Sequence, residues 1–257
     1  MQIRYLPVLG ILRELYQQPR SMARFREYVA RLTGGGDDIV LPIGVANPMA
    51  KEQALAKLEE LLGLGAEDIG AEATQEAAGR LSEVDTVPIT ASIVLVDDVG
   101  GGWTNRYTTE AMVRFPGRGA LKRPFATALA WTSESPTRAQ LREEVLAAMY
   151  RVAHQQRFGL PVSLGERLRQ EGLAAQFAGV QTTLSAPDLH RADQTIGELG
   201  EDPPYPQVFS ALYGDAAAVE LGYQPLGLPP RAGFEVAVVR MRGVDPVASL
   251  SRKVERR

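Results

Sequence analysis

A glycine-rich segment, VDDVGGGWTNRYTTE at positions 96–110, gathers residue types that bind ligands. Asp97 and Asp98 follow an apolar run, and carboxylates are the ligands that a hydrated Mg²⁺ ion prefers. Three consecutive glycines are more than a tight hairpin needs, and glycine lets a ligand approach the backbone closely. The pattern therefore nominates Asp97 and Asp98 as metal ligands. These carboxylates make Mg²⁺ a candidate cofactor. The sequence does not identify any other cofactor, so its identity remains open.

The same segment offers three side chains for substrate binding. Trp103 supplies a stacking face, and Asn105 and Arg106 supply polar groups that can reach a ligand. The glycines do not match a phosphate-binding loop, which needs a following Lys-Ser/Thr, and they lack the spacing of a dinucleotide-binding turn. A flexible hairpin with solvated aspartates is the competing interpretation, and the residues alone leave it open.

The segment GVANPMAKE, positions 44–52, predicts an anion site at the start of a helix. Asn47 suits the N-cap and Pro48 the first turn, so free backbone N–H groups and the positive end of the helix dipole meet there. Lys51 lies in this first turn, where a cation costs roughly 0.3–1 kcal/mol. A bound phosphate or carboxylate would reverse that cost. Arg138 is placed in the same way at the start of a long helix, and for both cations the alternative is that they point into water.

A third group of candidates comes from helical geometry. At about 100° per residue, four polar side chains lie within about 40° of one line, roughly opposite the apolar stripe of their helix: Glu143, Tyr150, His154 and Arg157. Imidazole titrates near neutral pH, so we assign proton transfer to His154, Glu143 and Tyr150. An ordinary surface helix also has a polar face opposite an apolar one, and this remains the alternative.

The segment RFPGRGALKRP, positions 114–124, predicts a basic loop between two strands. Arg118 and Arg123 are its candidates for binding an acidic substrate or the acidic end of a partner subunit. A solvated turn is the alternative. His190 lies among charged residues just after a predicted helix cap, and we interpret it as a solvated side chain.

Composition narrows the class of protein. The 257 residues carry a net charge of −3, which gives no support for binding to nucleic acid or to an anionic membrane. The chain has no cysteine and two histidines, which excludes disulfides, cysteine-bound metals and a three-histidine zinc site within one chain. No apolar run approaches the roughly 18 residues of a membrane span, and no secretory signal pattern is present. We therefore expect a soluble cytoplasmic protein.

Hydrophobic periodicity and turn residues predict both helices and strands. The predicted helices cover 21–32, 47–63, 66–81, 135–159, 163–178, 187–199 and 205–222. The predicted strands cover 39–44, 87–98, 106–115, 124–134 and 233–241.

This order of elements lacks the regular alternation of a doubly wound sheet. Short connections between the three central strands favour antiparallel neighbours. We therefore predict an α+β fold with a mainly antiparallel sheet of about five strands and helices packed chiefly on one face. One domain is expected over residues 1–245, followed by a mobile charged tail over 246–257.

Two functions remain open at this point, and whether the protein is an enzyme is uncertain. The first is an enzyme for a small metabolite that bears phosphate or carboxylate, bound by the candidate residues Asn47, Lys51, Trp103, Asn105, Arg106, Arg118, Arg123 and Arg138. The second is a non-catalytic scaffold or assembly subunit that binds a protein partner, or another copy of itself, through Tyr, Phe and Pro residues near 203–230. The first requires residues 47–51, 97–106 and 143–157 to share one cleft.

Overall fold

The computed structural model describes residues 3–84, 87–99, 105–119 and 125–251. The elements, in chain order, are β1 (Ile3–Tyr5), α1 (Leu9–Tyr16), α2 (Met22–Thr33), α3 (Glu52–Gly63), α4 (Ala66–Arg80), β2 (Ile89–Val96), α5 (Arg106–Arg114), β3 (Phe125–Trp131), α6 (Arg138–Phe158), α7 (Leu164–Ala178), α8 (Ala186–Gly197), α9 (Tyr205–Tyr213), α10 (Asp215–Glu220), α11 (Ala232–Arg240) and α12 (Pro246–Ser251).

The chain divides into two compact units, Met1–Val152 and Ala153–Arg257. The division falls inside α6, so the first part of that helix belongs to the first unit and its end to the second. The expectation of a single domain over 1–245 stays a prediction. Part of the predicted tail forms α12, and residues 252–257 lie outside the described residues.

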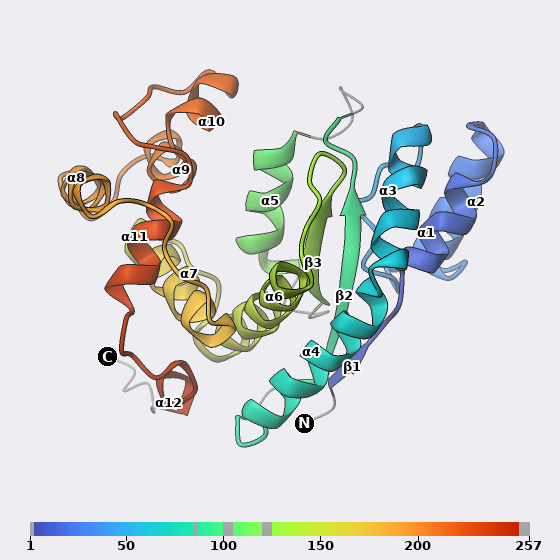
Figure 1. Ribbon diagram of the computed structural model, residues 1–257, viewed down its shortest axis with the longest axis horizontal. Helices are drawn as coiled ribbons and strands as arrows, with labels where there is room; N and C mark the ends of the chain where they lie inside the picture. The colour runs from blue at the N-terminus through green and yellow to red at the C-terminus, as the bar shows by residue number, and fades with distance from the viewer. Residues whose placement is uncertain (1–2, 85–86, 100–104, 120–124, 252–257) are drawn as a thin grey trace. The chain divides into compact units, whose positions relative to one another are not determined.

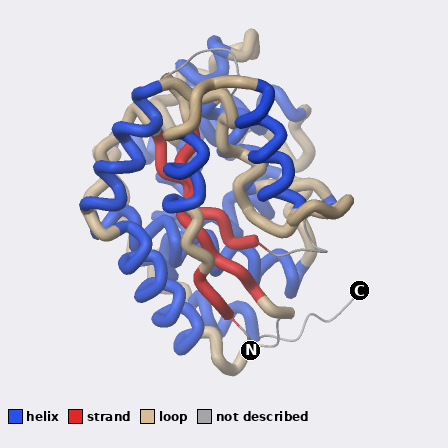
Figure 2. Tube along the Cα trace, turned by 90° about the vertical axis from the view of Figure 1, so that its right-hand side faces the viewer, coloured by secondary structure: helices blue, strands red, loops and turns tan. Residues whose placement is uncertain are grey.

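The first unit is built on a three-stranded sheet in the order β1-β2-β3 (Figures 1 and 2). Both pairs of strands are parallel, with Ile3 opposite Ile89 in one pair and Val96 opposite Trp131 in the other. The prediction of a mainly antiparallel five-stranded sheet is therefore wrong. Parallel neighbours need crossover connections, and α5 forms the helix of the crossover from β2 to β3.

Strand β2 is the centre of this unit. All of its residues except Thr90 are buried, although successive side chains of a strand point to opposite faces. Helices therefore cover both faces: α1 and α4 contact β2 on one side, and α5 lies on the other side of the sheet (Figure 1). The expectation of helices chiefly on one face is wrong. A continuous apolar strand is the usual mark of a parallel sheet buried on both sides.

Residues 106–115, predicted as a strand, form α5 instead. Threonines and a valine in the run favoured the strand. The Asn105 side chain, however, accepts a hydrogen bond from the backbone N–H of Thr108 and so caps a helix. Arg114 also donates to Glu110 one turn earlier, over 2.6 Å between Nε and Oε1. Spacing of this kind satisfies the side chains only in a helix.

Two other predicted strands are wrong as well. Residues 39–44 form turns and irregular chain, and 233–241 correspond to α11. A short apolar run such as that in 233–241 fits a buried helix as well as a strand, because periodicity cannot separate the two. The two predicted strands at 87–98 and 124–134 are confirmed as β2 and β3. Strand β1 has three residues and was not predicted.

The predicted helices are confirmed, with changed ends. Helix α3 begins at Glu52 with Lys51 as its N-cap, rather than at Asn47, and α6 begins at Arg138. The helix predicted over 205–222 is divided into α9 and α10 at Gly214, whose φ is +84°. None of the helices in the described ranges is long and apolar enough to cross a membrane.

The second unit is helical in its described part. Helix α11 packs against α7, α8 and α9. At its contact with α7 the two backbones approach closely, because a Cβ added to Gly172 would meet the carbonyl oxygen of Ala237. In this core Phe209 and Tyr213 of α9 stack, and Phe234 of α11 meets the Tyr213 ring edge-on.

Candidate functional site

The carboxyl ends of β2 and β3 lie at the same edge of the sheet, because the two strands are parallel. Ligands of parallel α/β sheets usually bind outside this edge. Asp97 and Asp98 directly follow β2, and Thr132, Ser133 and Glu134 directly follow β3. The Thr132 hydroxyl donates to the carbonyl oxygen of Val96 over 3.0 Å and joins the two strand ends.

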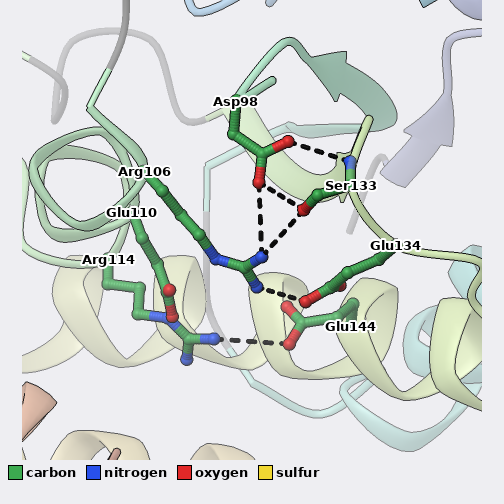
Figure 3. Close-up of polar contacts among 7 residues, drawn as sticks. All are labelled: Asp98, Arg106, Glu110, Arg114, Ser133, Glu134 and Glu144. Atoms are coloured by element: carbon green, nitrogen blue, oxygen red, sulfur yellow. Dashed lines mark hydrogen bonds and ion pairs between the residues drawn. The ribbon is translucent and has the colours of Figure 1, made fainter. Parts of the chain in front are cut away.

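Four side chains from three segments meet at this edge (Figure 3). The Asp98 carboxylate accepts hydrogen bonds from the backbone N–H of Ser133 over 2.9 Å and from its hydroxyl over 2.6 Å. Arg106, the first residue of α5, donates from Nη1 to Asp98 Oδ2 and to Ser133 Oγ, each over 3.3 Å. Its Nη2 pairs with Glu134. We call Asp98, Arg106, Ser133 and Glu134 the edge cluster.

Arg106 is held firmly but stays accessible. Its guanidinium carbon lies 4.8 Å from the centroid of the Trp131 ring, and 28% of its side chain is exposed. Burial lowers the pKa of Arg106, but the hydrogen bond and charge of Glu134, with the charges of Glu110 and Asp98, outweigh burial and raise that pKa above its usual value. Arg106 is therefore a fixed cation, and the two carboxylates leave the edge cluster with one net negative charge.

Asp97 points away from the edge cluster. Its Oδ2 accepts hydrogen bonds from the side-chain amides of Asn47, over 3.3 Å, and Gln53, over 3.4 Å, on the α3 side of the sheet. Asp98 pairs with Arg106 on the α5 side. Adjacent residues at a strand end alternate between faces, so the structure does not bring the two predicted metal ligands together. Within the described ranges, no three His, Asp or Glu residues form a group that could hold a metal.

The predicted anion site at 44–52 is also rearranged. Asn47 is buried, and its Oδ1 accepts a hydrogen bond from the Met49 backbone N–H inside a turn, five residues before α3. Lys51 is the exposed N-cap of α3, and it makes no ion pair with any residue that the structure describes. The amide of Asn47 faces Asp97, so this segment and the end of β2 do share one region.

The remaining predicted binding residues are dispersed. Arg138 donates from Nη1 to the Leu64 carbonyl oxygen over 2.7 Å at the end of α3, and Arg118 is exposed. Asn105 is occupied as the cap of α5. Trp103 and Arg123 lie outside the described residues.

The predicted proton-transfer residues do not form an exposed polar face. Tyr150 is fully buried, and His154 is 6% exposed. Burial, together with the positive charge of Arg169, lowers the pKa of His154 to about 4, so the imidazole is neutral at pH 7. Burial raises the pKa of Glu143 above its ordinary value. The surface-helix alternative is wrong for Tyr150 and His154, because both belong to the buried part of α6.

A line of charges extends from the edge cluster along α5 (Figure 3). Arg106, Glu110 and Arg114 occupy successive turns of one helix face, and Arg114 pairs with both Glu110 and Glu144 of α6. Glu110 and Arg114 are buried. Arg114 was predicted to belong to the basic loop, but it joins α5 to α6 instead.

Sequence reasoning missed Ser133, Glu134 and Gln53. The signal that could have found Ser133 and Glu134 is their position directly after an apolar strand, as for Asp97 and Asp98. That position indicates a shared site only when the two strands are known to be parallel, because only then do both strand ends lie at the same edge of the sheet.

Comparison with known proteins assigns neither a family nor a function to the chain. No protein-family model matches the chain, and no curated protein and no solved structure matches it.

Proposed function

We propose that the protein is an enzyme that binds a small metabolite bearing phosphate or carboxylate at the carboxyl ends of β2 and β3. The proposed site consists of the edge cluster alone and, unlike the site expected from the sequence, does not require residues 47–51 and 143–157 to share its cleft. One observation supports this most: Arg106 is a partly exposed cation, fixed by Asp98, Glu134 and Trp131 at the sheet edge. A guanidinium presents several donors in a planar fork that fits a phosphate or carboxylate.

Charge at the site favours a divalent cation as the co-ligand. The edge cluster carries one net negative charge, so an anion alone would be repelled by Asp98 and Glu134. Mg²⁺ is commonly held by one or two carboxylates together with the phosphate of the substrate. An ion shared by Glu134 and the substrate would need no group of three protein carboxylates and would release Arg106 to bind the anion.

A thermal-shift screen tests this proposal. The probes are phenyl phosphate, benzoate, nucleotides and sugar phosphates, each with and without Mg²⁺. A ligand that binds the native state at a hundred times its Kd adds about 2.7 kcal/mol to the free energy of unfolding. We expect at least one phosphate probe to stabilise the protein, more strongly with Mg²⁺.

Two arginine variants show where such a probe binds. Arg106→Gln should lose most of the shift. Arg142→Gln is the matched control, because Arg142 of α6 is also paired with a glutamate, Glu76 of α4, which is not part of the edge cluster. Equal shifts in both variants, or a flat screen, would rule out the edge cluster as an anion site.

A flat screen would favour the second candidate, a non-catalytic protein that binds a protein partner or a second copy of itself. Tyr205 and Val219 support it, since 50% and 62% of their surfaces are exposed within the 203–230 region. Phe209 and Tyr213 of the same region are buried and could not contribute. Light scattering would measure self-association. Under either candidate function we propose that the protein is cytoplasmic, and cell fractionation tests this location.

A further inference from the structure

Ser133 has the environment of a nucleophile. It is exposed and directly follows β3 and Thr132. Its hydroxyl donates to Asp98 Oδ2 over 2.6 Å, and the Asp98 side chain is only 6% exposed. Its Oγ also accepts a hydrogen bond from Arg106 Nη1 over 3.3 Å. A hydroxyl, a carboxylate that can take its proton and a cation for the reacting anion therefore meet within hydrogen-bond distance (Figure 3).

We propose that Ser133 accepts a phosphoryl group from a phosphate ester bound at Arg106. This inference rests on the proposed function and adds the reaction. The Ser133 Oγ–P bond forms while the P–O bond to the leaving alcohol breaks. The hydroxyl proton passes to Asp98 and from there to the leaving alkoxide oxygen. Water later hydrolyses the phosphoserine and releases inorganic phosphate.

The geometry assigns a separate task to each neighbour. Asp98 orients the hydroxyl and receives its proton, which is general base catalysis. The guanidinium of Arg106 touches Ser133 Oγ, so a phosphate held by that guanidinium lies beside the nucleophile. The positive charge also stabilises the charge that develops on the phosphoryl oxygens.

A purely structural role for Ser133 makes different predictions. Asp98 Oδ1 binds the Ser133 backbone N–H over 2.9 Å, so the two strand ends stay joined when the hydroxyl is removed. Ser133→Ala should therefore fold, and its far-UV circular dichroism should match that of the natural chain. Only the reactivity of the site should be lost.

A fluorophosphonate reagent tests the proposal without knowledge of the natural substrate. It reacts with an activated serine by forming the Oγ–P bond and releasing fluoride. Intact mass and peptide mapping should show one modified residue, Ser133. Labelling should be absent in Ser133→Ala, at least tenfold slower in Asp98→Asn, and retained at a reduced rate in Ser133→Thr.

Ser135→Ala is the matched control. Ser135 is an exposed serine two residues further along, outside the edge cluster. Its hydroxyl accepts a hydrogen bond from Lys57 over 3.0 Å and is also hydrogen-bonded to Glu60, so it has no contact with Asp98 or Arg106 in the described residues. Its loss should leave labelling unchanged. An unlabelled Ser133, or equal rates in the natural chain and in Asp98→Asn, would overturn the nucleophile. If the thermal-shift screen still shows binding that depends on Arg106, only the nucleophile fails. If that binding is absent as well, the proposed function fails with it.

Discussion

At the residue scale, the burial of His154 makes its protonation a determinant of stability. Its pKa is about 4 in the folded chain and about 6.5 in an unfolded one. Between these values the unfolded chain binds more protons, so the free energy of unfolding falls as pH decreases from 6.5 towards 4. The full effect is on the order of 3 kcal/mol. We expect His154→Gln to weaken this pH dependence, measured by urea unfolding at pH 7 and pH 4.5.

The second histidine provides the control for this measurement. His190 is exposed on α8, so His190→Gln should retain the pH dependence of the natural chain. If His154→Gln and the natural chain lose the same free energy between the two pH values, burial of His154 is not the cause.

Part of the candidate site could be predicted from residue types. Asp98 and Arg106 flank the glycine segment in sequence, and the structure brings them together. The separation of Asp97 from Asp98 could not be predicted, because it depends on which face of the strand end each one occupies. Ser133 is 35 residues from Asp98, and their contact depends on the parallel pairing of β2 with β3. Local sequence carries no information about such pairing.

At the element scale, the crossing of α7 and α11 depends on a glycine. A Cβ at Gly172 would meet the carbonyl oxygen of Ala237 and would lie 2.5 Å from Met241 Cγ. Gly172→Ala must push the helices apart, and overpacking of this kind typically costs about 1–3 kcal/mol. We expect that loss in the free energy of unfolding by urea. Gly197→Ala on α8 is the control, since no atom lies within 4 Å of its added Cβ, and its stability should be unchanged or higher.

Elements were predicted well where helical periodicity is long and badly where runs are short. Helices α2, α4, α7 and α8 follow from their apolar spacing and from serine caps or glycine ends. Helix α5 has nine residues, and its threonines gave it the appearance of a strand. That one change removes a strand between β2 and β3 and turns an antiparallel meander into a parallel pair. The antiparallel order was therefore lost through one local ambiguity, and the count of five strands through two more, at 39–44 and 233–241.

At the scale of the whole molecule, the continuity of α6 connects the two units. The helix has 21 residues, and the division at Val152 and Ala153 falls within it. Met149 and Ala153, on either side of that division, are completely buried. Unfolding of either unit would remove one end of a continuous helix, so we expect the units to unfold in one transition, as a single domain does.

Tryptophan fluorescence can test this cooperativity. The chain has two tryptophans, of which Trp103 lies outside the described residues and Trp131 ends β3 of the first unit. Gly172 belongs to the second unit. If unfolding is cooperative, Gly172→Ala lowers the urea midpoint reported by fluorescence as much as the midpoint reported by circular dichroism. Gly197→Ala, also in the second unit, should lower neither. A fluorescence midpoint unmoved by Gly172→Ala, beside a second transition in circular dichroism, would mean that the units unfold independently and that 1–245 is not one domain. The edge cluster could then be studied in the first unit alone, since all four of its residues lie within Met1–Val152.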